Sequence, residues 1–531
     1  MDTTPLDDLA ARAHDTHVVV VGGGIAGLVA AFACAKVGIR VTVLEASGRL
    51  GGAIRTAEVG GMRADLGAEG YATRGGAVRA LVEELGLIDA VVPTVPRAEW
   101  IAGLPGGSLP FPAATLRGIP ENPWEQSVRR VIGWRGTWRA YVDRVRPPLT
   151  IGQERSLGKL VRTRMGELVL DRLVAPLSLG GFLIHPDEVD VEVAVPGLGA
   201  ALTRTGSLAG AVSSLLDSAR KNDNDSARKS DSARKSDNDS ARKSDTAAGD
   251  RLEGIDGGMS RIVDALHERL RTLGADVRVN SPVAAVEAGT GGRWMLRLDA
   301  TGVLSSAPST IAAAGTDDAA DTAAAGTIDA ADIVILATGA EAAYKLLHEV
   351  VPSLEPTPIT DLEVVTLVVS SADLAAAPAR TAAYPVTGTA VAASVTDSTA
   401  RWPWMLPDAD TRVLKVTFGG RGVGPATAAL EDRAAAALAL AEASALLDVP
   451  LAATQLRASR RDRWAQPPPI SALGRRDAAA AARTAIHAVP GLAVVGAWVA
   501  GTGLAQVVPD ALAEAERVRR LTLWAGADER A

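Results

Sequence analysis

Cysteine and histidine are scarce in this chain of 531 residues. Cys34 is the only cysteine, which excludes an internal disulfide and favours a reducing compartment. Its apolar neighbours indicate a small side chain on a buried helix face rather than a redox thiol. The six histidines are scattered without HxH or HExxH spacing, so we expect no metal site.

Excess positive charge and long apolar runs are also missing. The formal net charge of −7 argues against a nucleic-acid partner. No run of about 18 apolar residues appears, so a membrane-spanning helix is not expected. The polar start from Met1 to Asp15 is unlike a secretory signal. With 47% hydrophobic and 22% charged residues, the composition predicts a globular protein. The single cysteine and the start of the chain predict a cytoplasmic location, with membrane association left open.

Two segments have low complexity and little to bury. The pentapeptide DSARK starts at Asp217, Asp225, Asp231 and Asp239. Such a tract is expected to stay solvated and mobile, as a repeat expansion in a surface loop. The second segment, 301–330, is rich in Ala, Thr, Asp and Gly and reads as a long connection between two strands.

Periodicity predicts regular elements between these segments. Among them are one helix from Leu157 to Leu173 and one strand from Val277 to Glu287. A short strand from His17 to Val21, a helix from Ile25 to Val37 and a strand from Val41 to Leu44 open the chain.

Glycines with a specific spacing lie inside this first strand-helix-strand unit. Gly22, Gly24 and Gly27 form a G-x-G-x-x-G pattern between the strand and the helix. They permit a tight turn, close approach of a pyrophosphate and close helix packing, while free amides at the helix start bind phosphate. Glu45 ends the second strand, where a carboxylate can accept hydrogen bonds from ribose hydroxyls. The unit predicts a dinucleotide site.

The residues that follow identify the dinucleotide by resemblance. Arg49, Gly51 and Gly52 in LEASGRLGG, then DLGAEGY from Asp65 to Tyr71, resemble flavin amine oxidases, carotenoid desaturases and protoporphyrinogen oxidases. The resemblance implies FAD, with the arginine and the paired glycines around its pyrophosphate and ribityl chain. It places the DLGA segment beneath the isoalloxazine ring.

Two distant segments extend this resemblance. It implies that the strand holding Val283 contacts the adenine, and that the helix after Gly501 and Gly503 begins at the N1/O2 edge of the flavin. The positive end of that helix would stabilise negative charge on the reduced ring. The expected cofactor-binding residues are Gly22, Gly24, Ile25, Ala26, Gly27, Glu45, Ala46, Arg49, Gly51, Gly52, Gly67, Ala68, Val283, Trp464, Gly496, Leu504, Gln506 and Val507.

Three further segments resemble protoporphyrinogen and coproporphyrinogen III oxidases in particular. They run from Gly67 to Val92, from Ser156 to Leu198, and from Ser394 through TARWPW to Lys415. The resemblance implies six-electron oxidation of a porphyrinogen in haem biosynthesis, with O2 as acceptor and release of H2O2. Without a targeting peptide, the chain looks like the soluble Gram-positive-type branch, which is associated with coproporphyrinogen III.

The chain departs from the family pattern at two places. It reads Phe182-Leu183-Ile184-His185 before Pro186, and Gly501 to Gln506 replaces the usual GxGIPD. These changes concern substrate and flavin-edge contacts and leave the flavin fold intact. Three alternatives stay open: a flavin amine oxidase, a carotenoid desaturase, or a flavoprotein without catalysis. His185 is expected to be structural, and no catalytic base is identified.

Cations and aromatics gather between Phe111 and Arg172. This stretch holds twelve Lys and Arg against six Asp and Glu, interleaved with Trp124, Trp134, Trp138 and Tyr141. It predicts either a surface for propionates and peripheral membrane contact, or simply a solvated helical surface. Arg97 resembles the substrate-strand arginine that meets a propionate. Haem-pathway enzymes are further possible partners, and the oligomeric state is left open.

The expected fold class is α/β: a Rossmann-like FAD-binding domain of the amine oxidase/PHBH type, an α+β substrate-binding domain and a mostly helical insertion. FAD-binding parts are expected at 1–90, 251–345 and 481–531. Substrate-binding parts are expected at 91–110 and 346–480, the basic helical domain at 111–205, and the disordered repeat insert at 206–250.

Overall fold

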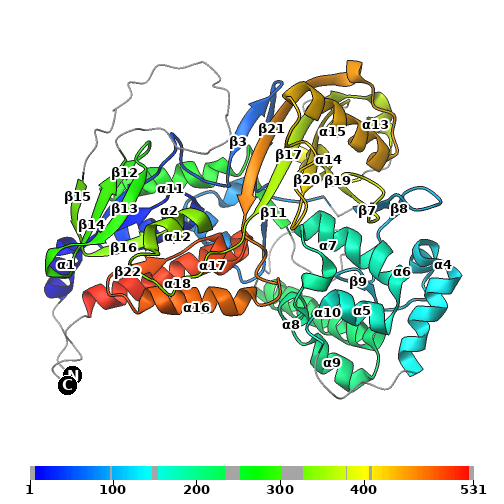
Figure 1. Cartoon of the computed structure of the whole chain (residues 1–531), viewed down its shortest axis with the longest axis horizontal. Helices are drawn as coiled ribbons and strands as arrows, with labels where there is room; N and C mark the ends of the chain where they lie inside the picture. Colours follow the sequence, from blue (N-terminus) through cyan, green and yellow to red (C-terminus); the bar gives the residue numbers. More distant parts are fainter. Residues whose placement is uncertain are drawn as a thin grey trace.

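The structure is a computed structural model that describes residues 6–95, 99–145, 154–233, 252–299, 327–377, 380–405 and 410–524. Figure 1 shows a sheet with its helices on the left, a second sheet at the upper right, and a group of helices at the lower right. The two sheets each draw on several parts of the chain, whereas the helical group comes from one continuous stretch.

The first sheet is parallel and has five strands. In spatial order they are β12 (Asp276–Arg278), β2 (Arg40–Leu44), β1 (His17–Val21), β16 (Ile333–Leu336) and β22 (Leu492–Val494). Val18 and Val20 of β1 pack with the helices α2 (Ile25–Ala35), α11 (Ser260–Thr272) and α18 (Leu504–Leu523). Val19 and Val21 belong to a separate core cluster with β14 (Trp294–Leu298) and α12 (Ala340–Leu347). Because both faces are covered, β1 is apolar at every position from Val18 to Val21.

The second sheet has seven strands. They are β21 (Leu456–Gln466), β17 (Thr360–Ser370), β20 (Thr411–Gly419), β19 (Ala392–Asp397), β18 (Ala382–Pro385), β7 (Glu99–Ala102) and β8 (Leu109–Pro110). One face packs on α15 (Asp432–Leu447) around a core that includes Val365, Leu414 and Val416. β7 pairs in parallel with β18, so residues near 100 complete a sheet built mainly after residue 360.

The third region is helical and has a core of its own. Its helices are α4 (Gln126–Tyr141), α5 (Leu157–Arg164), α6 (Glu167–Val169), α7 (Ala175–Phe182), α8 (Val191–Ala194), α9 (Leu198–Thr205) and α10 (Leu208–Ala233). Asp143 is fully buried and lies 2.5 Å from the Arg164 guanidinium. Its other oxygen accepts a hydrogen bond from the Leu208 amide, so this ion pair fixes the start of α10.

Helix α10 corrects one expectation. The sequence predicts a disordered insert from 206 to 250, whereas the structure keeps one helix from Leu208 to Ala233, through the first two DSARK copies and into the third. Buried Leu208, Val212 and Leu216 anchor this helix, and the Ala, Arg and Lys that follow favour its continuation. Residues 234–251 lie outside the described residues, as do 300–326 of the second low-complexity segment.

The remaining elements connect these regions. They include α1 (Leu6–Asp15), β3 (Thr56–Val59), β4 (Met62–Asp65), β5 (Tyr71–Ala72), α3 (Ala77–Glu84), β6 (Val91–Pro93), β9 (Thr115–Leu116), β10 (Ile119–Pro120), β11 (Leu252–Ile255), β13 (Val283–Ala288), β15 (Thr327–Ala331), α13 (Ala372–Ala376), α14 (Ser398–Arg401), α16 (Arg475–His487) and α17 (Ala497–Ala500). None of the helices that the structure describes is long and apolar enough to cross a membrane. The domain boundaries expected from the sequence stay a prediction.

Candidate functional site

The glycine turn between β1 and α2 leaves no room for a side chain at Gly22 or Gly27. Gly22 has φ +112°, and a Cβ on it would come within 2.7 Å of the Ala337 carbonyl oxygen. A Cβ on Gly27 would lie 2.1 Å from the Gly22 carbonyl oxygen. Gly24 is the N-cap of α2, whose first turn, with Ile25 and Ala26, carries no acidic side chain. The positive end of this helix therefore suits an anionic group such as phosphate.

Glu45 stands at the end of β2 and is held in place by hydrogen bonds. Its Oε2 accepts from the Gly23 amide at 2.7 Å, and its Oε1 accepts from the Ser47 amide and hydroxyl at 2.8 and 2.7 Å. The carboxylate thus connects the glycine turn with the segment that begins at Ala46. Lone pairs beyond these three bonds can accept from ribose hydroxyls.

A second glycine turn lies directly against the first. The Gly51 amide donates to the Gly23 carbonyl at 2.8 Å, and a Cβ on Gly52 would lie 3.2 Å from the Gly24 Cα. The Arg49 guanidinium donates to the Gly52 carbonyl at 3.1 Å, which holds this turn closed. Two glycine segments, expected separately from the sequence, therefore form one cradle.

Three arginines gather around two carboxylates beside the cradle. Asp462 is buried and lies 3.4 Å from the Arg55 guanidinium and 3.1 Å from that of Arg460. Burial lowers the pKa of Arg49, with Glu45 and Asp462 opposing the shift. Burial, with repulsion from Arg460 and Arg49, also lowers the pKa of Arg55. This surplus of one positive charge fits the pyrophosphate of a dinucleotide.

Arg460 and Asp462 were missed by sequence reasoning, although they lie four and two residues before the expected Trp464. Their role depends on β21 lying beside the segment of Arg55, which no local pattern reveals.

The carboxyl end of β16 carries an unsatisfied hydroxyl. Thr338 Oγ1 is buried and has no hydrogen-bond partner among the described residues. A Cβ on Gly22 would lie 3.1 Å from the Thr338 amide, and one on Gly496 would lie 3.8 Å from its carbonyl oxygen. Buried polar atoms in proteins are almost always paired, so the hydroxyl fits a polar ligand here. Thr338 was missed by sequence reasoning.

The final helix begins at the same edge of the sheet. Gly496 has φ +118° and leads through Gly501 to Leu504, the first residue of α18. Gln506 Oε1 accepts a hydrogen bond from the Gly503 amide at 3.3 Å, and Val507 is buried in the core. Helix α18 packs beside α2, which brings the expected C-terminal residues to the glycine cradle.

Gly67 and Ala68 extend the site toward the second sheet. A Cβ on Gly67 would lie 1.9 Å from the Ala53 carbonyl oxygen and 3.4 Å from the Trp464 ring. The Ala68 amide donates to the same Ala53 carbonyl at 3.2 Å. Val283 begins β13, shortly after Ser281, whose amide donates to the Glu45 carbonyl at 2.8 Å. The described site residues thus run from the first sheet to β21.

Two expected residues lie apart from this arrangement. Arg97 lies outside the described residues. His185 is the N-cap of a short 3-10 helix, and its Nδ1 accepts from the Asp187 amide at 3.2 Å, which gives it the structural role expected from the sequence.

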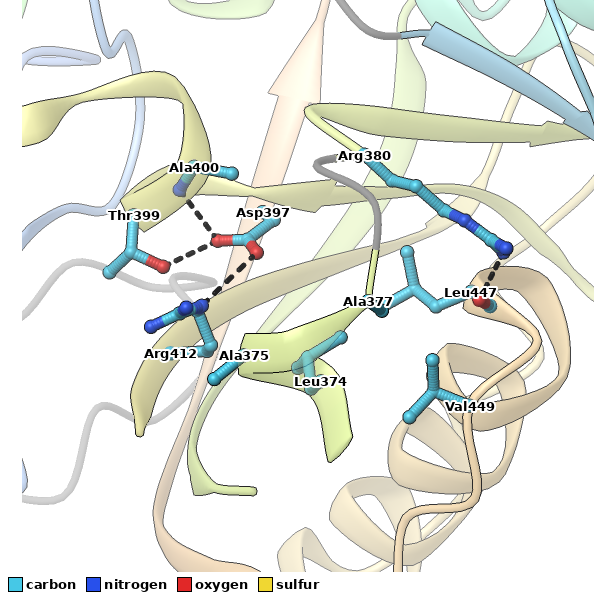
Figure 2. A pocket seen from close by; sticks show the side chains of 10 residues that line it. All are labelled: Leu374, Ala375, Ala377, Arg380, Asp397, Thr399, Ala400, Arg412, Leu447 and Val449. Atoms are coloured by element: carbon cyan, nitrogen blue, oxygen red, sulfur yellow. Dashed lines mark hydrogen bonds and ion pairs between the residues drawn. The ribbon is translucent and has the colours of Figure 1, made fainter. Parts of the chain in front are cut away.

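Figure 2 shows a cavity of about 140 Å³ on the α15 side of the second sheet, apart from the glycine cradle. Its charged side chains are tied to helix ends. Arg380 donates to the Leu447 carbonyl at the end of α15, and Asp397 accepts from the Ala400 amide at the start of α14. Arg412 lies 3.9 Å from Asp397. These contacts explain the charged side chains of the cavity as structural, without a ligand.

The chain matches a known family over almost its whole length. The sequence model described as "Flavin containing amine oxidoreductase" matches residues 25–519. The coproporphyrinogen III oxidase of Mycobacterium leprae is 28% identical over 497 residues, covering 91% of this chain and 94% of the relative. The coproporphyrinogen III oxidase of Propionibacterium freudenreichii is 33% identical over 283 residues, which spans 53% of that relative.

Solved structures show the same fold. A protein from Exiguobacterium sp. 255-15, provisionally assigned as a protoporphyrinogen oxidase, has a TM-score of 0.75 at 21% identity, covering 95% of this chain and 99% of that one. A UDP-galactopyranose mutase has a TM-score of 0.64 at 13% identity, covering 96% and 94%. The glycine cradle, the cationic cluster and the full-length match agree: the chain belongs to the family of flavin-containing amine oxidoreductases, and its cofactor is FAD.

Proposed function

We propose that this flavoprotein oxidises a porphyrinogen to a porphyrin, with coproporphyrinogen III as the first candidate substrate. The observation that carries the proposal is the match along 91% of the chain to a relative named coproporphyrinogen III oxidase. The fold shared with the Exiguobacterium protein supports it. By the same proposal, O2 is the acceptor: three molecules of O2 become three of H2O2 as six hydrogens leave the macrocycle.

The chain's own residues bind and orient the reacting groups. The amides of the Gly22–Gly27 turn and the cationic cluster hold the phosphates, and Glu45 holds the ribose. Gly67, Ala68 and Trp464, which lie between the glycine cradle and the second sheet, would contact the flavin. When bound, FAD supplies the chemistry, because its ring accepts a hydride from the substrate carbon. No protein base is assigned.

An apolar wall in the helical region suits the substrate. A small cavity there is lined mostly by apolar side chains, including Leu177, Phe182 and Ile184, and reaches Ser471 in the segment after Trp464. The Arg117 guanidinium stacks over the Phe182 ring at 4.2 Å. With a volume of about 20 Å³ this cavity is too small to hold a macrocycle, so it can offer only an apolar wall with one cation at its rim. Phe182 and Ile184 of the departing segment line this cavity, whereas His185 caps a short helix.

Amine oxidation is the main alternative, and the placement of Trp498 weighs against it. Amine oxidases need aromatic side chains that frame the amine at the flavin face. Trp498 is 3% exposed and packs in the core with Val499 and Leu492, so it faces no substrate. We therefore rank porphyrinogen oxidation first.

The test is aerobic turnover by the purified holoenzyme. Coproporphyrinogen III, protoporphyrinogen IX and a set of primary amines are supplied in parallel, with porphyrin fluorescence and H2O2 as readouts. The proposal predicts fluorescence growth with coproporphyrinogen III and stoichiometric H2O2, and none in the flavin-free protein. Peroxide from amines alone would replace the proposal with amine oxidation.

A further inference from the structure

One face of the second sheet carries adjacent polar side chains near its centre. Thr366 of β17 is the register partner of Lys415 of β20, and Lys415 is in turn the partner of Thr396 of β19. Register partners project to the same side of a sheet. The opposite side, with Val365 and Val416, packs on α15, so the polar side chains face away from that core.

Two of these polar side chains are buried without a full set of partners. Lys415 is 7% exposed, and its ammonium lies 2.7 Å from Glu69 Oε1. Thr366 is fully buried, and its hydroxyl has no hydrogen-bond partner among the described residues. Because buried polar groups normally have hydrogen-bond partners, we expect a further polar group to bind at this face.

Glu69 joins this face to the flavin site. It follows Gly67 and Ala68 directly, so its ion pair with Lys415 lies next to the segment that packs beside Trp464. In Figure 1, β17 and β21 run down from the second sheet toward α17, next to the start of α18.

Two cations, Lys415 and Arg401, contact the Glu69 carboxylate. This carboxylate accepts from the Ser398 hydroxyl at 2.5 Å and lies 3.5 Å from the Arg401 guanidinium. Burial alone would raise the pKa of Glu69, but Lys415 and Arg401 lower it to about 2. The Glu69 carboxylate is therefore ionised. The cluster holds two cations, Lys415 and Arg401, and a second carboxylate, Asp65, which also interacts with Lys415.

We propose that Lys415, held by Glu69, is a positioning residue that raises the reduction potential of the bound FAD. Reduction adds electrons to the ring, and a buried positive charge nearby stabilises the more negative form. Glu69 fixes the ammonium and moderates its field. The inference rests on the FAD cofactor and is independent of the substrate.

The test is an equilibrium redox titration of the holoenzyme against a reference dye, with no substrate present. Lys415→Met is expected to shift the potential to a more negative value, by about a tenfold change in the reduction equilibrium, or about 30 mV for a two-electron couple. Lys415→Arg keeps the charge and is expected to keep most of the potential. Lys345→Met is the matched control, because Lys345 also pairs with a glutamate at 2.7 Å but on the exposed face of α12.

Glu69→Gln is expected to shift the reduction potential of the bound FAD in the opposite direction to Lys415→Met. It removes the counter-charge and is expected to shift the potential to a more positive value. If Lys415→Met does not retain FAD, the direction of the potential shift in Glu69→Gln tests the inference by itself. The inference is overturned if the flavin-bound variants keep the wild-type potential, or if Glu69→Gln shifts it to a more negative value. Inactivity toward porphyrinogens would leave these potentials interpretable.

Discussion

Gly27 lies where helix α2 packs against the glycine turn that precedes it. A Cβ at Gly27 would overlap the Gly22 carbonyl oxygen, so in Gly27→Ala the phosphate-binding turn must shift. The variant is expected to lower FAD affinity by at least about tenfold. FAD retention after dialysis and fluorescence titration of the flavin-free protein measure the change. Gly106→Ala is the control, because a Cβ there meets nothing within 4 Å. Equal FAD affinity in both variants would contradict a tight turn.

Asp65 gives a prediction about stability and pH. Burial raises the pKa of Asp65 to about 6, against hydrogen bonds from Thr56 and Met259 that lower it. The folded state therefore binds this proton more tightly than the unfolded chain. The contribution of protonated Asp65 to the free energy of unfolding is fully present below the unfolded pKa near 3.8, and it is lost as pH rises through about 6.

Asp65→Asn is accordingly expected to stabilise the protein by about 2–3 kcal/mol at about pH 8 and by less than about 1 kcal/mol at about pH 4. An amide oxygen can accept both hydrogen bonds without the cost of a buried charge. Urea unfolding at the two pH values measures the difference, with exposed Asp264→Asn as control. If the stability gained by Asp65→Asn grew as pH falls, the predicted direction of the pH dependence would be wrong.

Single residues also differ in how far the sequence predicts their role. The spacing of Gly27 from Gly22 predicts a close contact between helix and strand, and that contact is present. Thr338, Arg460 and Asp462 could not be predicted in the same way. Their importance comes from strands that meet only in three dimensions, and no local pattern encodes that meeting.

At the scale of elements, sequence periodicity finds most helices and strands but not their interruptions. The single strand expected from Val277 to Glu287 is two strands, β12 and β13, in different sheets. Asn280, with φ +51°, and Pro282 between them break the ladder. The helix expected from Leu157 to Leu173 is interrupted at Gly166, where φ is +95°. Apolar residues on both sides hide such breaks from a periodicity argument.

Helix α10 depends on an ion pair that lies far from it in sequence. Asp143→Ala is expected to cost about 3–5 kcal/mol, because it removes the acceptor of the Leu208 amide and the carboxylate that neutralises buried Arg164. Thermal unfolding and hydrogen exchange across α10 would measure this loss of stability. The surface variant Asp264→Ala should stay within about 0.5 kcal/mol. If Asp143→Ala lowered the stability as little as Asp264→Ala does, α10 would not depend on the ion pair of Asp143.

For the whole molecule, charge is unevenly distributed. The chain is net negative, yet α4, at the far right of Figure 1, exposes Trp134 and Trp138 at 60% and 57% beside several arginines. Trp124 contacts both rings edge to face, and the Arg129 guanidinium stacks over Trp134 at 4.8 Å. Aromatic rings with arginines suit the interface of an anionic membrane.

We therefore expect binding to vesicles that contain anionic phospholipid, and weaker binding to zwitterionic ones. Replacing Trp134 and Trp138 by Ser should lower vesicle partitioning about tenfold in a sedimentation assay. Trp524→Ser is the control, since Trp524 is 50% exposed at the end of α18, outside this patch. Partitioning that is unaffected by the double variant would assign α4 a solvated surface instead.

The most direct test of the whole account is reduction of the bound flavin by coproporphyrinogen III without oxygen. The holoenzyme is mixed with the porphyrinogen under anaerobic conditions while the oxidised flavin spectrum is followed, and O2 is then admitted. The account predicts loss of the oxidised spectrum, its return with O2, and fluorescent porphyrin as product. A flavin that stays oxidised with this porphyrinogen and with protoporphyrinogen IX would contradict the proposed function.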